Sequence, residues 1–432
     1  MTTEHTANSA GEAIEELDVV ILGAGVAGLG AALKARETGR SAVIFEARET
    51  AGGLLDNFTI DGFRFDHAVH LSFATEDKVR AIFDSTPYLT HPSDSYCFEG
   101  DRWLKHPVQN NLAPLDAADK VDLIKSFLAR PAAQAGDDYE SWLRHQYGDG
   151  IAERYPIRYT QKYWATPASA LSTNWIGQRM RRAELDEILF GAMTTHTPNT
   201  YYTKEMRYPK AGGYKAFIAP LIADADIRTG HAATAIDTAA RTVHFANGAQ
   251  VRYRTLVSTL PLPVLARIAQ DAPAAVRQAG EQLKATSIDL VSVGFNKPLV
   301  KDLWFYIYDD DILASRAYSP SVKSPENAPD GCSSLQFEIY SRGEQSSYDG
   351  AALKQNTVAA LEKMGIATAQ DIVVLDHRVL RFGNVIFDRG MEQHRQCVLD
   401  WARGAGIASC GRFGEWDYLW SNQSLLSGYN AL

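Results

Sequence analysis

A glycine-rich turn between an apolar strand and a helix constrains this chain more than any other feature of its sequence. Residues 17–22 (LDVVIL) form a continuous apolar run, which is typical of a strand buried on both faces of a parallel sheet. Gly23, Gly25 and Gly28 follow, and the residues after them have the composition of a helix. A second buried strand, SAVIFEAR, comes next over residues 41–48. The sequence therefore predicts an α/β fold that opens with a right-handed βαβ unit.

The spacing of these glycines is that of a dinucleotide-binding loop. Gly23 allows the tight turn, Gly25 lets the backbone approach a pyrophosphate, and Gly28 lets the helix pack closely on the strand. The phosphates would then lie at the positive end of the helix dipole. Glu46, about twenty residues further on, is placed to accept hydrogen bonds from a ribose. The alternative is a glycine-rich turn kept only for packing.

Residues just after the second strand distinguish between two dinucleotides. Arg48, Gly52, Gly53 and Leu54 extend the expected phosphate-facing surface beyond a minimal NAD site. The pattern E-A-R-x-x-x-G-G over residues 46–53 resembles that of the large flavoprotein group that contains amine oxidases, protoporphyrinogen oxidase and UDP-galactopyranose mutase. This resemblance favours FAD over NAD as the cofactor and implies that these residues help to hold it.

Composition excludes several classes of function. The net charge of −9, from 43 basic and 52 acidic residues, speaks against a nucleic-acid binder, although a few arginines inside a pocket can still bind an anionic ligand. No apolar run approaches the roughly 20 residues that span a bilayer, and the first residues lack the basic and apolar regions of a signal peptide. The four cysteines show no metal-ligand or disulfide spacing, so we expect no metal and a cytoplasmic enzyme.

The order of segments predicts a nucleotide-binding sheet assembled from separated pieces. Residues 17–75, 222–270 and 400–432 read as three FAD-binding segments. Residues 76–221 have long helical stretches and indicate a mostly helical substrate or cap region, whereas residues 271–399 alternate strands and helices and indicate a mixed-sheet substrate domain. The expected fold class is therefore α/β: a Rossmann-like FAD-binding domain built from discontinuous segments, with inserted helical and mixed α+β substrate domains.

Beyond the glycine-rich loop, the sequence resembles UDP-galactopyranose mutase more than the amine oxidases. Residues 65–73 (FDHAVHLSF) are similar to the mutases' G-P-H-x-F-H-T segment. His70 then matches the histidine that lies against the flavin near its reactive nitrogen, while the family's second histidine falls at Phe73, a departure. The alternative for His70 is a histidine that only satisfies hydrogen bonds at a strand end.

A central stretch resembles the family's substrate-binding segment. Residues 159–182, from YTQKYW to RMRR, are similar to the motif Y-T-x-K-x-W-G and the arginine-containing stretch after it. The resemblance implies that Trp164 is an aromatic wall and that Arg179 is a ligand for phosphate or sugar. Arg181 and Arg182 are alternatives to Arg179, because we expect one of the three in the pocket and the others on a solvated helix face.

Two later positions resemble the family's diphosphate ligands. Arg316 stands where the mutases have their second diphosphate-binding arginine, and Tyr340, in E-I-Y-S-R, matches their E-x-Y-S-R. An arginine suits a phosphate because its planar guanidinium gives two charge-assisted hydrogen bonds. The alternatives are a surface ion pair for Arg316 and simple packing within a strand for Tyr340.

The last segment, CGRFGEWDYLWSNQSLLSG, resembles the mutases' G-R-L-x-x-Y-x-Y-x-D-M-D followed by a helix. Gly411 and Arg412 are discriminating, because amine oxidases normally have an acidic residue after this glycine. By resemblance Arg412 pairs with the FAD pyrophosphate and Tyr418 points towards the substrate. S-N-Q replaces the acidic D-M-D, a second departure, and Ser421 or Asn422 can cap the last helix, whose dipole would face the flavin.

This resemblance covers nearly the whole chain from about residue 17 and implies a reaction. In the mutases, N5 of the reduced flavin attacks the anomeric carbon of a nucleotide-activated sugar, and the ring changes between pyranose and furanose without net redox change. The expected partners are a nucleotide sugar or another anionic small molecule and an external reductant, and an oligomer is compatible with the sequence. The rival hypothesis is a FAD-dependent oxidoreductase, an oxidase or dehydrogenase that takes hydride from its substrate. A third is a flavoprotein-fold binding or scaffold protein without catalysis.

Overall fold

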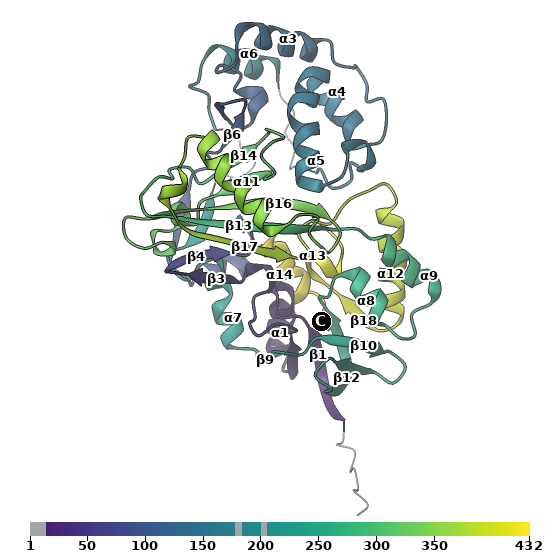
Figure 1. The fold of residues 1–432 in the computed structure, drawn as a ribbon. Coiled ribbons are helices and arrows are strands. Elements are labelled where there is room, and N and C mark those ends of the chain that lie inside the picture. Colours follow the sequence, from purple (N-terminus) through teal and green to yellow (C-terminus); the bar gives the residue numbers. More distant parts are fainter. Residues whose placement is uncertain (1–13, 178–183, 200–204) are drawn as a thin grey trace, which may run out of the picture.

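The computed structural model describes residues 14–177, 184–199 and 205–432. Helices lie at one end of the molecule, a mixed sheet lies in the middle, and a mainly parallel sheet lies at the other end (Figure 1). The predicted α/β fold class is confirmed. Among the described residues, no helix is long and apolar enough to cross a membrane.

The mainly parallel sheet carries the glycine-rich loop. Its parallel strands are β1 (Glu15–Leu22), β2 (Ala42–Phe45), β9 (Asp226–Arg228), β12 (Gln250–Ser258) and β18 (Ile407–Ser409). The antiparallel strands β10 (Ala233–Asp237) and β11 (Thr242–Phe245) extend one edge. The helix α1 (Val26–Glu37) follows β1 directly, because the glycines let the chain turn at the end of the strand. Three separated parts of the chain thus build one sheet.

The mixed sheet has the strand order β17-β13-β16-β15-β14-β6-β7. Its strands are β6 (Tyr96–Glu99), β7 (Arg102–Lys105), β13 (Thr286–Phe295), β14 (Trp304–Ile307), β15 (Arg316–Tyr318), β16 (Ser333–Arg342) and β17 (Ile372–Leu380). All residues of β13 are buried, because the strand lies between β16 and β17 and α11 (Gly350–Lys363) covers one face of the sheet. Ile288 of β13 also lines the cavity described below. β6 and β7 come from the region predicted as mostly helical, so that region also supplies two strands to this sheet.

The helical end is anchored to the mixed sheet by a lysine. Its helices are α3 (Ala117–Leu128), α4 (Tyr139–Ala152), the π-helical turn η3 (Glu153–Ile157), α5 (Arg158–Trp164) and α6 (Leu185–Met193). Lys162 on α5 donates hydrogen bonds from Nζ to the carbonyl oxygens of Ile307, Asp309 and Ile312 at 2.8–3.0 Å. α5 is therefore fixed against the end of β14, beside the cavity.

Shorter elements connect these layers. They are η1 (Gly53–Leu55), β3 (Asn57–Ile60), β4 (Phe63–Asp66), α2 (Asp77–Phe83), β5 (Tyr88–His91), η2 (Val108–Asn110), η4 (Ala168–Ala170), β8 (Met206–Pro209), η5 (Tyr214–Ile218), α7 (Ala219–Ala223), α8 (Leu262–Ile268), α9 (Ala274–Gln282), α10 (Pro320–Lys323), η6 (Pro325–Asn327), η7 (Ala369–Asp371), α12 (Met391–Gly404), α13 (Gly411–Gly414) and α14 (Ser421–Tyr429). α14 packs along α1, so the last helix of the chain lies beside the first.

The start of α14 corrects one expectation. The N-cap residue is Trp420, whose backbone N–H donates to Oε1 of Gln423 at 2.9 Å. Neither Ser421 nor Asn422 caps the helix, because both already lie inside it and both side chains are bonded elsewhere. The Ser421 hydroxyl bonds to the hydroxyl of Tyr214 at 2.7 Å, and the Asn422 amide donates to the carboxylate of Glu76 at 2.9 and 3.0 Å.

Candidate functional site

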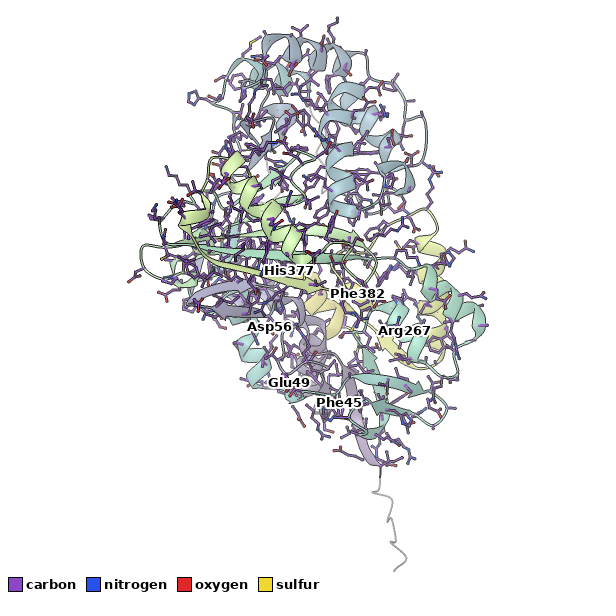
Figure 2. The ribbon with its side chains drawn as sticks, viewed as in Figure 1. Phe45, Glu49, Asp56, Arg267, His377 and Phe382 are labelled. Atoms are coloured by element: carbon purple, nitrogen blue, oxygen red, sulfur yellow. The ribbon has the colours of Figure 1, made fainter. Side chains whose placement is uncertain are left out.

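A cavity of about 680 Å³ lies between the two large sheets. Gly23, Glu46 and Thr259 line it, and each follows the carboxyl end of a parallel strand, the usual place for a ligand in such sheets. Phe45 lies at the level of the parallel sheet and Phe382 lies beside the mixed sheet (Figure 2), and both also line the cavity. The cavity therefore reaches from one sheet to the other.

Most predicted site residues share this cavity. Those that line it are Gly23, Gly25, Glu46, Arg48, Gly52, Gly53, Leu54, His70, Arg316, Tyr340, Gly411, Arg412, Tyr418 and Ser421. Three other predicted residues that the structure describes, Gly28, Trp164 and Asn422, do not line it. Arg179, with its alternatives Arg181 and Arg182, lies outside the described residues.

The glycines form a narrow cradle at one end of the cavity. Gly53 has φ +60°, and a Cβ added there would lie 2.9 Å from the Cα of Gly25, so no side chain fits between these two backbone segments. Gly28 packs against the carbonyl of Gly23 instead of facing the cavity, which is the helix-packing role of the third glycine. The exposed backbone at Gly25, which begins α1, is suited to a phosphate.

Glu46 is held at the same end by backbone donors. Its Oε2 accepts from the N–H of Ala24 at 2.8 Å, and its Oε1 accepts from the N–H of Arg48 at 3.0 Å. Each carboxylate oxygen has a second lone pair, so the side chain can still accept from a ribose. The Arg48 guanidinium donates from Nη2 to the carbonyl oxygen of Gly53 at 2.7 Å and so braces the glycine cradle.

His70 lines the cavity with a defined proton position. Its Nε2 lies 2.8 Å from the carbonyl oxygen of Leu54 and 3.1 Å from that of His67. Carbonyl oxygens only accept, so Nε2 carries the proton and Nδ1 is left as an acceptor. Burial lowers the pKa of His70 to about 4, so the ring is neutral at pH 7.

Arg412 stands beside a residue that sequence reasoning missed. Arg412 donates from Nη2 to Oδ1 of Asn384 at 2.9 Å and from Nη1 to the carbonyl oxygen of Leu419 at 3.0 Å. Within the part of the chain that the structure describes, Nε of Arg412 and Nδ2 of Asn384 are buried without a hydrogen-bond partner. Asn384 lies in a loop after β17, and no motif marks it in the sequence.

Arg316 and Tyr340 meet across neighbouring strands. Nη2 of Arg316 donates to the Tyr340 hydroxyl at 3.1 Å, and both groups bond to the fully buried carboxylate of Glu338. The N–H of Val69 donates to the other Glu338 oxygen at 2.8 Å. Burial alone would raise the pKa of Glu338, but Arg316 and these hydrogen bonds hold it below its usual value. Glu338 was missed in the sequence, although it lies two residues before Tyr340 and so shares its face of the strand.

An aromatic wall closes the cavity next to α5, with one correction. Tyr163 lines the cavity, and its hydroxyl bonds to that of Tyr418 at 3.1 Å. Trp164, the residue predicted as the wall, packs behind it, with ring centroids 5.1 Å from Trp175 and 5.8 Å from Tyr418. Neighbouring residues of a helix point about 100° apart, so only one of the pair can face the cavity.

Two aromatic rings meet near the start of α14. Phe73 and Trp420 both line the cavity, with ring centroids 5.4 Å apart. Phe73 is the position where the resemblance predicts a histidine. This position on the wall is therefore apolar where a polar group was expected.

The charges on the cavity wall favour an anionic ligand. Arg48, Arg316, Arg381 and Arg412 line it, and among the described lining residues the acidic counterpart is Glu46. Together with the glycine cradle and the unpartnered buried donors near Arg412, this wall fits a dinucleotide that carries a pyrophosphate. The negative net charge of the chain does not prevent this, because a cationic pocket acts locally.

Comparison with known proteins places these features among flavoenzymes. Residues 21–86 match the family of NAD(P)-binding Rossmann-like domains. A crystal structure of reduced UDP-galactopyranose mutase superposes with a TM-score of 0.88 at 25% identity, over 96% of this chain and 94% of that one. A putrescine oxidase double mutant shares the fold, with a TM-score of 0.64 at 17% identity over 96% and 98% of the two chains.

The curated sequence relatives match a shorter segment. Mitochondrial protoporphyrinogen oxidase of Nicotiana tabacum is 32% identical over 108 residues, which is 25% of this chain and 21% of that protein. The chain thus matches about a fifth of the length of that relative.

Proposed function

We propose that this chain isomerises the sugar ring of a nucleotide-activated sugar, with FAD as its cofactor. The premise is that the chain belongs to the UDP-galactopyranose mutase-like branch of the FAD-dependent amine oxidase superfamily. The protein is a flavoenzyme of the oxidase and mutase type. When bound and reduced, the flavin supplies N5 as a nucleophile for the anomeric carbon of the sugar.

The contact between Arg316 and Tyr340 carries this proposal. A nucleotide diphosphate that leaves the sugar needs positive charge and donors beside it, and Arg316 and Tyr340 present both to the cavity. An amine or alkane substrate would make no charge-assisted hydrogen bonds to this guanidinium. Arg179 remains the predicted second cation of this diphosphate site.

Other residues support the same chemistry from the cofactor side. We assign the pyrophosphate to the glycine cradle and Arg412, and the ribose to Glu46. The first turn of α14 lines the cavity with Ser421, so its dipole favours negative charge on a reduced flavin. The neutral His70 offers a hydrogen-bond acceptor and adds no competing charge. An external reductant would supply the electrons once, since the isomerisation consumes none.

A second candidate function is net oxidoreduction, and one observation favours it. Phe73 and Trp420 form an apolar patch beside Ser421, and an apolar patch suits hydride removal from a saturated carbon. In this case Arg316 would serve mainly as the partner of Glu338, whose carboxylate balances its charge.

Reduction-dependent turnover separates the two candidates. The purified flavin-loaded protein is incubated with UDP-galactose and related sugar nucleotides, oxidised or reduced with dithionite, and the products are separated by chromatography. The proposal predicts that the reduced protein forms a ring isomer of the sugar nucleotide and that the oxidised protein does not. Bleaching of the flavin by an amine or alcohol, restored by oxygen with release of peroxide, would establish the oxidoreductase instead.

A further inference from the structure

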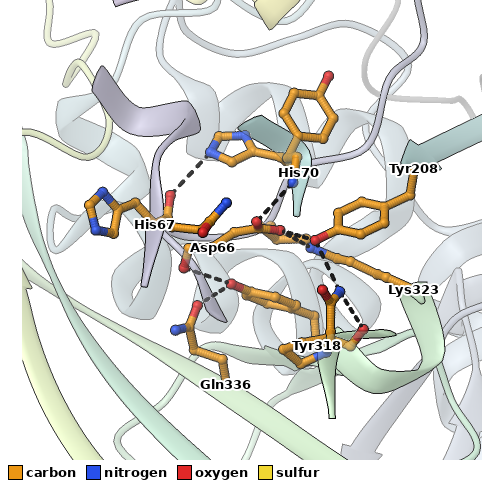
Figure 3. A network of polar contacts seen from close by, with 12 residues as sticks. Asp66, His67, His70, Tyr208, Tyr318, Lys323 and Gln336 are labelled. Carbon is orange, nitrogen blue, oxygen red and sulfur yellow. Dashed lines mark hydrogen bonds and ion pairs between the residues drawn. The ribbon is translucent and has the colours of Figure 1, made fainter. Parts of the chain in front are cut away.

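A fully buried ion pair lies behind the wall of the cavity. Nζ of Lys323 on α10 is 3.4 Å from Oδ2 of Asp66 at the end of β4, and both side chains have 0% exposure (Figure 3). The ammonium also lies over the ring of Tyr318, 3.9 Å from its centroid. A buried pair of this kind is seldom kept for stability, because desolvation costs about as much as the attraction gains. Its contacts show what else it does.

Asp66 joins several distant segments of the chain. Its Oδ1 accepts from the backbone N–H of Tyr214 at 3.0 Å, and its Oδ2 accepts from the hydroxyl of Tyr208 at 2.7 Å. Its carbonyl oxygen accepts from the hydroxyl of Tyr318 at 3.3 Å, and that tyrosine also bonds to Gln336 (Figure 3). The Asp66 carboxylate thus joins β4 to β8, η5 and α10, while its backbone carbonyl joins β4 to β15.

Tyr214 carries this arrangement to the cavity. Its ring lies against the imidazole of His70, with centroids 5.2 Å apart, and its hydroxyl bonds to that of Ser421 at 2.7 Å. Tyr214 is fully buried, whereas His70 and Ser421 both line the cavity. One side chain therefore supports two cavity residues that come from different ends of the chain.

The pair also acts on His70 through charge. After burial, which is the largest influence, Asp66 raises the pKa of His70 and Lys323 lowers it. The two charges oppose one another, so burial remains the main influence and favours the neutral imidazole. The pKa of Lys323 is in turn raised by the charge of Glu338 and lowered by that of Arg316.

We propose that Lys323 is a positioning residue of the cofactor site: it pairs with Asp66, whose other carboxylate oxygen holds the backbone N–H of Tyr214, and so it fixes Tyr214 against His70 and the first turn of α14 and keeps Nδ1 of His70 free to accept a hydrogen bond. This inference rests on the proposed FAD site and is independent of the isomerase reaction. Without the lysine charge, the negative charge of Asp66 acts on His70 unopposed and should raise its pKa. Without either charge, the pair has no effect on this pKa.

The test is a titration of His70 in the flavin-loaded protein without any substrate. Histidine labelled with ¹⁵N is followed by NMR as the pH changes, with the His70 signal assigned from a His70→Asn variant. In Lys323→Met we expect the midpoint of His70 to rise above the wild-type value of about 4. In Asp66→Asn/Lys323→Met we expect it to return towards that value. A His70 midpoint that is the same in all three proteins would overturn the proposal.

The flavin reports the same change independently. A protonated His70 beside the cofactor would stabilise a negatively charged reduced flavin. At pH values below the raised His70 midpoint, the flavin reduction potential of Lys323→Met should therefore be higher than that of the wild type. At pH values above that midpoint, the two potentials should be equal. The double variant should match wild type throughout. Arg154→Met is the control, because it breaks an ion pair with the largely buried Glu99 that does not line the cavity, and it should lower stability with no change in potential.

Folding failure does not remove the test. If Lys323→Met does not accumulate, Tyr214→Phe retains the ion pair and the ring contact but loses the bond to Ser421. We then expect a changed visible circular dichroism of the bound flavin, together with an unchanged His70 midpoint. An unchanged dichroism spectrum would contradict the inference that Tyr214 positions the first turn of α14 through Ser421. A protein without isomerase activity would still give these signals, so failure of the proposed reaction is distinguishable.

Discussion

Replacing Arg316 by methionine tests the assignment of the anion site most sharply. The side chain of Met is close in length to the Arg stem but has no charge and no donors, so Glu338 loses its cation and keeps the Tyr340 hydroxyl and the Val69 N–H. Glu338 has 0% exposure, so its carboxylate has no contact with bulk water in the wild type. The variant therefore removes an expected phosphate ligand and leaves a buried carboxylate uncompensated.

The two effects have different sizes. Breaking one partner of a buried ion pair costs about 3–5 kcal/mol of folding stability. Loss of hydrogen bonds to a charged phosphate costs about 1.5–3 kcal/mol, which is roughly a 10- to 150-fold rise in the dissociation constant of UDP. The double variant Arg316→Met/Glu338→Gln should regain most of the stability, because no buried charge remains, but none of the UDP affinity.

The pH dependence gives the sign of the stability effect. In the wild type the pKa of Glu338 is held below its ordinary value, so its contribution is present above that ordinary value and is lost as the pH falls through the lowered one. In Arg316→Met burial is unopposed by a cation and raises this pKa, so the variant should gain stability relative to wild type as the pH falls.

Urea unfolding and calorimetric titration of flavin-loaded protein with UDP measure these quantities. A dissociation constant for UDP within twofold of wild type in both variants would refute the phosphate assignment. Lost UDP affinity with unchanged stability would refute the account of Glu338.

Three further predictions concern other parts of the cavity. Gly53→Ala should abolish flavin retention, measured by absorbance after gel filtration, because the new Cβ would lie 2.9 Å from the Cα of Gly25. Gly404→Ala, with no atom within 4 Å of the new Cβ, is the control. Phe73→His should lower the free energy of unfolding in urea by about 0.5–1.5 kcal/mol, the value of an aromatic pair, and Phe73→Tyr should not. Tyr163→Phe should lower the free energy of unfolding in urea by roughly 1 kcal/mol, because it removes the hydrogen bond to the Tyr418 hydroxyl. Trp164→Phe should also lower stability, and it should leave UDP affinity unchanged because Trp164 does not line the cavity.

Features set by neighbours in sequence were accessible to prediction. The turn at Gly23, the following helix and the acid at the end of the second strand depend on residues within a short span, and local patterns describe such spans well. The two residues of the proposed phosphate site, Arg316 and Tyr340, came only from the family resemblance. Nothing in the local sequence places β15 beside β16.

Contacts between distant segments could not be predicted. Asp66 and Lys323 are 257 positions apart, and Asn384 meets Arg412 from a loop without a motif. The family motif predicts Trp164 as the aromatic wall, yet the rotation of α5 turns the neighbouring Tyr163 to the cavity instead. The strands β6 and β7 were assigned to a helical region because short strands are hard to recognise among helices.

A crystal structure of the flavin-loaded protein with UDP tests the central claim most directly. The account predicts the isoalloxazine in the cavity between the two sheets, with the diphosphate oxygens within hydrogen-bond distance of the Arg316 guanidinium and the Tyr340 hydroxyl. A structure in which UDP binds elsewhere, or in which Arg316 contacts only Glu338 while an apolar ligand fills the cavity, would contradict it.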